Sequence, residues 1–163
     1  MTLPVFVLKR TFDAPRDLVW RTWTDPDLVQ RWYGPGVETV LHEFNPTPGG
    51  LWLNEMRMGD NSMYQRTEFT EVEPPSRLVM LMSNSDANWE PADSPMNPNW
   101  PRTLLTTITL TENGDQTDMV LEWAPHNATD DQIEAFRAAL GDLDKGWGAG
   151  MDIVAEILAE LQS

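Results

Sequence analysis

The apolar periodicity of the last fifth of the chain, from Thr129 to Gln162, constrains the fold more than any other feature. Thr129 followed by Gln132 fits a capping box, with Asp130 and Asp131 facing the positive end of a helix. The spacing of three and four predicts an amphipathic helix with one buried face. The apolar positions are Ile133, Phe136, Leu140, Leu143, Trp147, Met151, Val154, Leu158 and Leu161.

This predicted helix is too long for the domain and contains glycines. About 33 residues at 1.5 Å each would extend about 50 Å, whereas a domain of this size has a diameter of roughly 40 Å. We therefore expect a bend near Gly141, and prefer it to two separate helices because the apolar stripe keeps its phase there. Gly146 and Gly150 flank Trp147. They indicate either close backbone packing, which we favour, or room for something bound beside Trp147.

Composition predicts one domain over residues 1–163, large enough for a real core. The absence of cysteine excludes disulfides and thiolate metal sites. The apolar start, Met1 to Leu8, lacks the pattern of a signal peptide, and no apolar run is long enough to span a membrane. We expect a cytoplasmic protein.

The charge balance narrows the partners. Acids outnumber bases 26 to 11, for a formal net charge of −15, which disfavours nucleic acids and anionic lipid surfaces. The acidic outer side of the terminal helix is more typical of a solvated surface than of a docking face. His42 and His126 lack metal-ligand spacing, and no glycine-rich phosphate loop is present, so we expect neither a metal nor a cofactor.

The upstream chain has the pattern of one strand, two short helices and six further strands. Pro15 and Pro26 open the two short helices. Short connections between successive strands predict an antiparallel meander, and the whole is an α+β domain. The predicted strands cover residues 3–12, Val37–Phe44, Leu51–Met58, Met63–Val72, Leu78–Ser83, Thr103–Thr111 and Thr117–Ala124.

One connection, Asn84 to Pro101, is too long for a tight meander. It is rich in Asn, Asp and Pro, yet contains Trp89, Met96 and Trp100. Long loops in small domains are usually functional or disordered. The segment is therefore either a lid over the mouth of a cavity or a loop fastened to its own sheet by its large side chains.

Several motifs, in order along nearly the whole chain, resemble the SRPBCC (START-like) superfamily, and within it the branch related to the activator of heat-shock protein 90 ATPase. The match depends on the order and spacing of these motifs rather than on any one of them. They are Asp13-Ala14-Pro15, Leu18-Val19-Trp20, Thr24-Asp25-Pro26, Leu28, Val29, Arg31-Trp32-Tyr33-Gly34-Pro35, Pro48-Gly49-Gly50, Glu71-Val72-Glu73-Pro74-Pro75, Arg77-Leu78, Trp123-Ala124-Pro125-His126-Asn127-Ala128-Thr129 and Gly146-Trp147.

The resemblance implies a helix-grip fold, in which a curved seven-stranded antiparallel sheet holds the C-terminal helix and encloses a cavity. It implies a small-molecule binding scaffold more than any single chemistry. We expect a small apolar molecule as ligand, since Trp and Met form large, adaptable apolar walls. The candidate lining residues are Trp23, Trp32, Trp52, Tyr64, Met80, Met82, Trp100, Thr107, Trp123, Trp147 and Met151.

Three polar residues are candidates for chemistry in such a cavity. Glu55 and Glu68, if they point inward, could supply a general base with a raised pKa. Alternating charges on a hairpin are more often cross-strand pairs on a wet face, which we favour. His126 could titrate at a cavity mouth, but a turn residue bonded to the backbone is the favoured reading.

The sequence therefore leaves three functions open. A binder of a small apolar molecule is preferred over a cyclase- or hydrolase-type enzyme that uses the same cavity. A co-chaperone-like regulator of a heat-shock protein 90 ATPase follows from the resemblance alone. A homodimer remains open as well.

Overall fold

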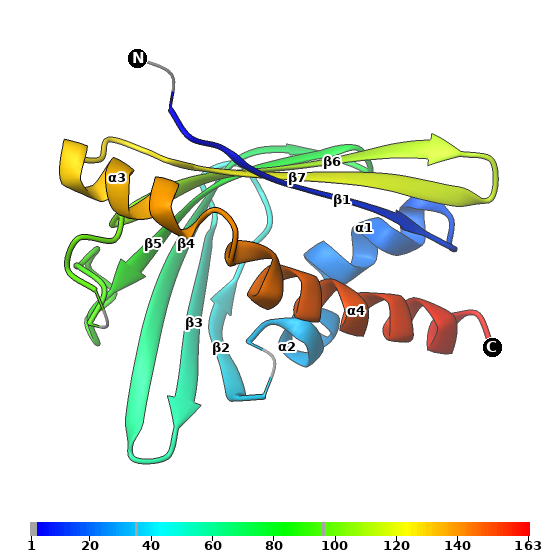
Figure 1. Cartoon of the computed structure of the whole chain (residues 1–163). Coiled ribbons are helices and arrows are strands. Elements are labelled where there is room, and N and C mark those ends of the chain that lie inside the picture. Colours follow the sequence, from blue (N-terminus) through cyan, green and yellow to red (C-terminus); the bar gives the residue numbers. More distant parts are fainter. Residues whose placement is uncertain (1–2, 35, 96) are drawn as a thin grey trace.

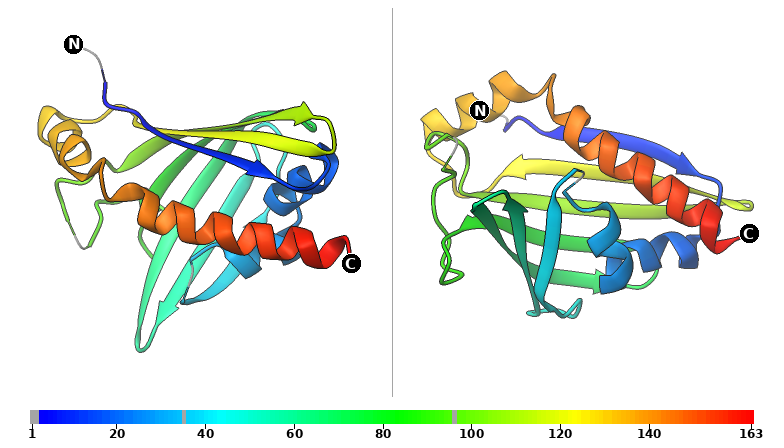
Figure 2. Two further views of the ribbon diagram at one scale, coloured as in Figure 1. Left: turned by 45° about the vertical axis from the view of Figure 1, so that its right-hand side comes forward. Right: turned by 90° about the horizontal axis from the view of Figure 1, so that it is seen from below.

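A curved antiparallel sheet grips the C-terminal helix in the computed structural model, which describes residues 3–34, 36–95 and 97–163 (Figure 1). The strand order is β1-β7-β6-β5-β4-β3-β2. Helices α1, α2 and α4 lie on the concave side, which we call the inner face (Figures 1 and 2). The elements are β1 (Phe6–Phe12), α1 (Arg16–Thr24), α2 (Pro26–Trp32), β2 (Glu38–Phe44), β3 (Leu51–Met58), β4 (Asn61–Glu73), β5 (Arg77–Ser85), β6 (Thr103–Asn113), β7 (Gln116–Pro125), α3 (Asp130–Ala139) and α4 (Leu143–Leu161).

This architecture confirms the predicted α+β helix-grip fold with seven strands and two short helices after the first strand. Every neighbouring pair of strands is antiparallel, as predicted, including β1 with β7 and β5 with β6, which no short connection joins. Strand bounds agree with the prediction to within a few residues, the largest difference being a first strand that begins at Phe6. Met1, Thr2, Pro35 and Met96, which belong to the apolar start, the Arg31–Pro35 motif and the long loop, lie outside the described residues.

The core lies between the inner face and the helices. Because successive side chains of a strand point to opposite faces, paired inner residues form rows across the sheet. One row pairs Trp52 with Thr67, Thr67 with Met82 and Met82 with Leu104, and all four are buried. Met151 of α4 is fully buried as well. Figure 2 shows α4 crossing the opening of the curved sheet beside β1 and α2.

Local sequence chemistry sets the helix ends. The Thr129 side chain accepts from the backbone N–H of Gln132, and the Gln132 side chain accepts from the backbone N–H of Thr129, so the predicted capping box is confirmed. Asp25 caps α2 by accepting from the N–H of Asp27, and Pro26 opens this helix. None of the helices in the described part of the chain combines the length and apolar character that crossing a membrane requires.

The expected single bent helix is wrong, because the terminal segment forms two helices. α3 ends at Ala139, and α4 begins at Leu143 after a turn that contains Gly141. The stripe continues across this break, with Phe136, Met151 and Val154 all buried. Two helices fit the domain where one continuous rod would overhang it.

One glycine of α4, Gly150, confirms the predicted close packing of the backbone. A side chain at Gly150 would meet the Trp32 ring at 3.3 Å, so this glycine lets the helix approach Trp32 closely. Gly148 faces the Arg10 guanidinium. Gly146 is exposed, and a methyl group added there would meet nothing within 4 Å, so close packing does not account for this glycine.

Candidate functional site

A continuous set of aromatic rings lies between the inner face of the sheet and the C-terminal helices. Trp100 contacts Trp123 at a centroid distance of 6.1 Å, and Trp123 contacts Trp147 of α4 at 5.6 Å. Trp147 contacts Tyr33 at 6.4 Å, and Tyr33 meets Trp52 edge-on at 4.8 Å. We call these five residues the aromatic wall. The wall joins the loop before β6, the sheet, α4 and the end of α2.

The aromatic wall reaches from the core to the surface. Trp52 is 2% exposed, whereas Tyr33, Trp100, Trp123 and Trp147 are only half-buried. Phe136 of α3 packs on Trp100 and Trp123 at 5.5 and 5.9 Å, which places this side of the wall near the break between α3 and α4. The solvent-exposed side of the wall therefore lies near the break between α3 and α4.

Besides Arg16, five side chains of the sheet and α1 carry buried polar atoms without a partner among the described residues. These atoms are buried, and within residues 3–34, 36–95 and 97–163 they form no hydrogen bond. Buried polar groups in proteins are nearly always hydrogen-bonded, because leaving one unpaired costs about 1–3 kcal/mol. Asn54 contributes both atoms of its amide. We call the following the inner polar atoms: Trp23 Nε1, Trp52 Nε1, Trp123 Nε1, Thr106 Oγ1, Asn54 Nδ2 and Asn54 Oδ1.

Sequence reasoning missed Asn54, Thr106 and Tyr33. Asn54 is two residues from Trp52 in a predicted strand, so the same alternation that puts Trp52 inside puts Asn54 inside. The Tyr33 hydroxyl donates to Gln65 Oε1, and burial raises the pKa of this phenol, an effect that the hydrogen bond to Gln65 opposes. Tyr33 is therefore a neutral, fixed member of the wall.

Most of the predicted lining residues do face the core. Trp23, Met80, Met82 and Met151 are buried there, with at most 4% exposure. Trp32 is also buried, and its indole donates to Thr22 O at 2.7 Å. These residues pack the inside rather than line an open space.

Two predicted lining residues lie on the other face. Thr107 neighbours the buried Thr106 in β6, and alternation turns it to the outer face. Tyr64 pairs with Glu55 across β3 and β4 on that same outer face. The prediction that Thr107 and Tyr64 line the interior is wrong, because each is an odd number of residues from an inward-facing neighbour in its strand.

Glu55 and Glu68 also lie on the outer face, so neither is an interior general base. Glu55 Oε1 is 2.8 Å from His42 Nε2, and its Oε2 accepts from Ser62 Oγ at 2.6 Å and from Arg57 Nε at 3.3 Å. The hydrogen bonds from Ser62 and His42, with Arg57 nearby, lower the pKa of Glu55 to about 2. A carboxylate held ionised in this way is a poor base, and the favoured reading of paired groups on the outer face is confirmed for Glu55.

His126 lies directly after β7, which ends at Pro125. It is half-buried, and its backbone N–H donates to Thr103 O at 3.0 Å. Asn127, the next residue, has a positive φ of 52°. His126 is thus bonded through its backbone to β6 at the start of a turn, and the favoured interpretation, a bond to the backbone around Asn127, stays a prediction.

The 86–102 loop is fastened at two places. Trp89 packs on the outer face against His42 and Tyr64, with centroid distances of 5.2 and 5.3 Å. Trp100, near the other end of the loop, belongs to the aromatic wall. Trp89 therefore fastens the loop to its own sheet, which is one of the two expected alternatives. For the part of the loop that carries Trp100, a lid over a cavity stays a prediction.

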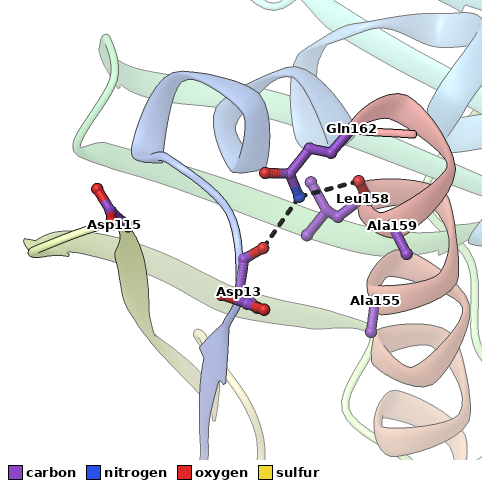
Figure 3. Close-up of a pocket in the computed structure, with 6 residues that line it drawn as sticks. All are labelled: Asp13, Asp115, Ala155, Leu158, Ala159 and Gln162. Carbon is purple, nitrogen blue, oxygen red and sulfur yellow. Dashed lines mark hydrogen bonds between the residues drawn. The ribbon is translucent and has the colours of Figure 1, made fainter.

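The aromatic wall lies between the sheet and the C-terminal helices, where the sequence predicts a hollow. Two prominent hollows in the described part of the chain lie elsewhere. One, of about 380 Å³, lies at the end of α4, where Gln162 Nε2 donates to Asp13 O and Leu158 O (Figure 3). The other lies beside β1 and β7 around Arg10 and Met119. A ligand in the grip would have to move side chains of the wall.

Comparison with known families identifies the fold's relatives. Residues 13–159 match the family described as Activator of Hsp90 ATPase homolog 1-like protein. The chain belongs to this family. No curated protein is a significant match to the chain.

Solved structures similar to this family member agree with the helix-grip fold. A solution structure of a protein from Arthrobacter aurescens has a TM-score of 0.80 at 23% identity, over 96% of this chain and 86% of that one. A crystal structure from Mycobacterium smegmatis has a TM-score of 0.76 at 18% identity, over 94% and 90% of the two chains. One from Rhodobacter sphaeroides has a TM-score of 0.77 at 17% identity, over 96% and 93%. At these identities the likeness shows the fold.

The interior of this family member is polar in places. Among its described residues Glu55 is the one buried charged side chain, and it lies on the outer face of the sheet. Arg10, on the inner face of β1, is half-buried and donates to Asp152 Oδ1 at 2.8 Å. The aromatic wall and the inner polar atoms thus suit uncharged molecules, since a buried ion without a partner is costly. No group of three or more potential metal ligands occurs among the residues described.

Proposed function

We propose that this protein binds a small, uncharged and largely apolar molecule against the aromatic wall. The inner polar atoms are the observation that carries the proposal. Three indole N–H groups, from Trp23, Trp52 and Trp123, are donors without acceptors within the described residues. A ligand with oxygen acceptors on an apolar body would satisfy them while its body packs on the rings.

The family supports this proposal in general terms, because its fold is of a ligand-binding type. The half-buried rings of Trp100 and Trp147 give the ligand a route from solvent. They lie beside the break between α3 and α4, where side chains can move without unwinding a helix. Entry would therefore displace rings of the wall and leave the sheet in place.

Nuclear magnetic resonance of the indole N–H groups tests the proposal, with 2-acetylnaphthalene as the probe. The probe offers one carbonyl acceptor on a flat apolar body. We expect saturable shifts of the indole signals of Trp52 and Trp123. The Trp89 indole is an internal control, since this residue packs on the outer face and should not respond.

A matched pair of variants sharpens the test. Trp123→Phe keeps an aromatic ring but removes one donor, so affinity should fall by about two- to tenfold, the value of one hydrogen bond. Trp89→Phe removes an indole from the outer face and should leave affinity unchanged. A probe that shifts only Trp89, or that shifts all indoles weakly without saturation, would overturn the proposal.

A further inference from the structure

Asn54 is the most costly of the inner polar groups to leave unpaired. It is 1% exposed on the inner face of β3, and both Nδ2 and Oδ1 form no hydrogen bond with the residues that the structure describes. A side-chain amide carries two donor hydrogens and an acceptor oxygen, so it is left unsatisfied in both senses. An apolar residue would fill this core position more cheaply. No contact within the described residues therefore explains an Asn at position 54.

We propose that Asn54 recognises a neutral amide-type group of the ligand, that is, a carboxamide, a lactam or a cyclic imide. This inference rests on the proposed function and names the chemistry that the interior selects. Such a group places a donor beside an acceptor, the complement of the Asn54 side chain. Two parallel hydrogen bonds would then pair Nδ2 and Oδ1 at once, as asparagine does with other donor–acceptor edges.

The neighbours of Asn54 leave its amide available to a ligand. Gln65 lies directly opposite across β3 and β4, but its Oε1 accepts from the Tyr33 hydroxyl. Leu41, the partner on β2, offers no polar side chain. Tyr33 packs on Trp52, two residues from Asn54 on the same face. Asn54 therefore lies next to the Tyr33–Trp52 part of the aromatic wall. The apolar body of a ligand bonded to Asn54 could pack on these rings.

The charges around this position favour a neutral group over a carboxylate. Glu55 faces the opposite side of β3 and is bonded to His42, Ser62 and Arg57. Arg10, the cation on the inner face of β1, lies five positions away from β3 in the strand order and bonds to Asp152. A carboxylate beside Asn54 would meet Oδ1 with no cation to balance it. A ketone would pair Nδ2 alone and leave Oδ1 unsatisfied.

Three probes with one body test the proposal: 2-naphthamide, 2-acetylnaphthalene and 2-naphthoate. We expect the full-length protein to bind the amide about tenfold more tightly than the ketone or the acid, because a site built to hydrogen-bond a group rejects analogues that lack it. In Asn54→Leu, this preference should fall to about one- to twofold, because the amide loses two hydrogen bonds to Asn54 whereas the ketone loses one. Calorimetry or the indole signals would supply the dissociation constants.

Thr67→Val is the matched control. Thr67 is a buried inner residue of β4, opposite Trp52, and the substitution changes its polarity without touching Asn54. It should keep the amide preference. If Asn54→Leu does not fold, the wild-type protein still decides, because equal binding of amide and ketone would overturn the inference.

The outcomes separate the two proposals. No saturable binding of any probe removes both the proposed function and the role of Asn54. Saturable binding of all three with equal affinity keeps the function and overturns the role of Asn54. An amide preference that survives in Asn54→Leu also overturns it, since another group would then read the amide.

Discussion

The Glu55 carboxylate is held by three different side chains on the outer face of the sheet. Ser62 donates at 2.6 Å, His42 lies at 2.8 Å and Arg57 donates at 3.3 Å. Because these contacts favour the ionised form, they lower the pKa of Glu55 from 4.5 to about 2. The group thus links the stability of this hairpin to pH. Trp89 packs on His42, so the 86–102 loop depends on the same cluster.

Glu55→Gln should destabilise the protein at neutral pH and matter little in acid. The folded pKa lies below the unfolded one, so the stabilisation is fully present above about pH 4.5 and is lost as the pH falls toward about 2. Melting temperatures of wild type and variant across this range should therefore converge on acidification. Glu43→Gln, an exposed position on β2, controls for the change in net charge. A gap that stays constant with pH would contradict the linkage.

At this scale the sequence predicts which residues are large and apolar better than it predicts where polar side chains point. Trp52 and Glu55 are three residues apart in one strand, so an inward Trp52 already requires an outward Glu55. Asn54 shares the parity of Trp52 and could have been found by the same argument. For Glu68 and Tyr64 the same argument applies, because an inward Phe69, one residue from Glu68 and five from Tyr64 in β4, already requires both to point outward.

Among the elements, strands and helix starts follow from local chemistry, but the helix break does not. The capping box at Thr129 and the alternation of Leu104, Thr106 and Ile108 are written in consecutive residues. The break after Ala139 depends on how the domain closes around α4, and the apolar stripe runs across it unchanged. A straight helix over the whole terminal segment is too long for the domain, but its length does not distinguish a bend from a break.

The glycines of α4 should respond oppositely to alanine. Gly146 is exposed with nothing near its added methyl, so Gly146→Ala should raise the free energy of unfolding by about 0.5–1 kcal/mol. Gly150→Ala would place a methyl 3.3 Å from Trp32, whose ring is fixed by its bond to Thr22 O. It should lower that free energy by about 1–3 kcal/mol through overpacking. Urea unfolding measures both, and equal effects would show that α4 does not press on Trp32.

For the molecule as a whole, the fold could be predicted and the interior could not. Motifs spread along the chain indicated the helix grip, and the structure confirms it. Whether the grip encloses a hollow depends on how Tyr33, Trp123 and Trp147 fill it, which is a property of side-chain packing across distant elements. The inner polar atoms depend on that packing too.

The net charge of −15 predicts that salt stabilises this protein. Even if all 11 basic residues paired with acids, most of the 26 acids would remain unpaired and repel one another in the folded state. Screening also weakens surface pairs such as Arg31–Glu160, at 2.6 Å, but exposed pairs contribute little. The free energy of unfolding should therefore rise by on the order of 1 kcal/mol between about 0.02 and about 0.5 M NaCl.

Choline chloride separates screening from binding of sodium. An equal rise in both salts indicates screening of the acidic surface, whereas a rise in NaCl alone indicates that sodium ions bind to carboxylates. The effect should flatten near the isoelectric point, where the repulsion disappears. A free energy of unfolding that stays constant or falls with salt at neutral pH would contradict this prediction. It would mean that the ion pairs stabilise the fold more than the repulsion between the acids destabilises it.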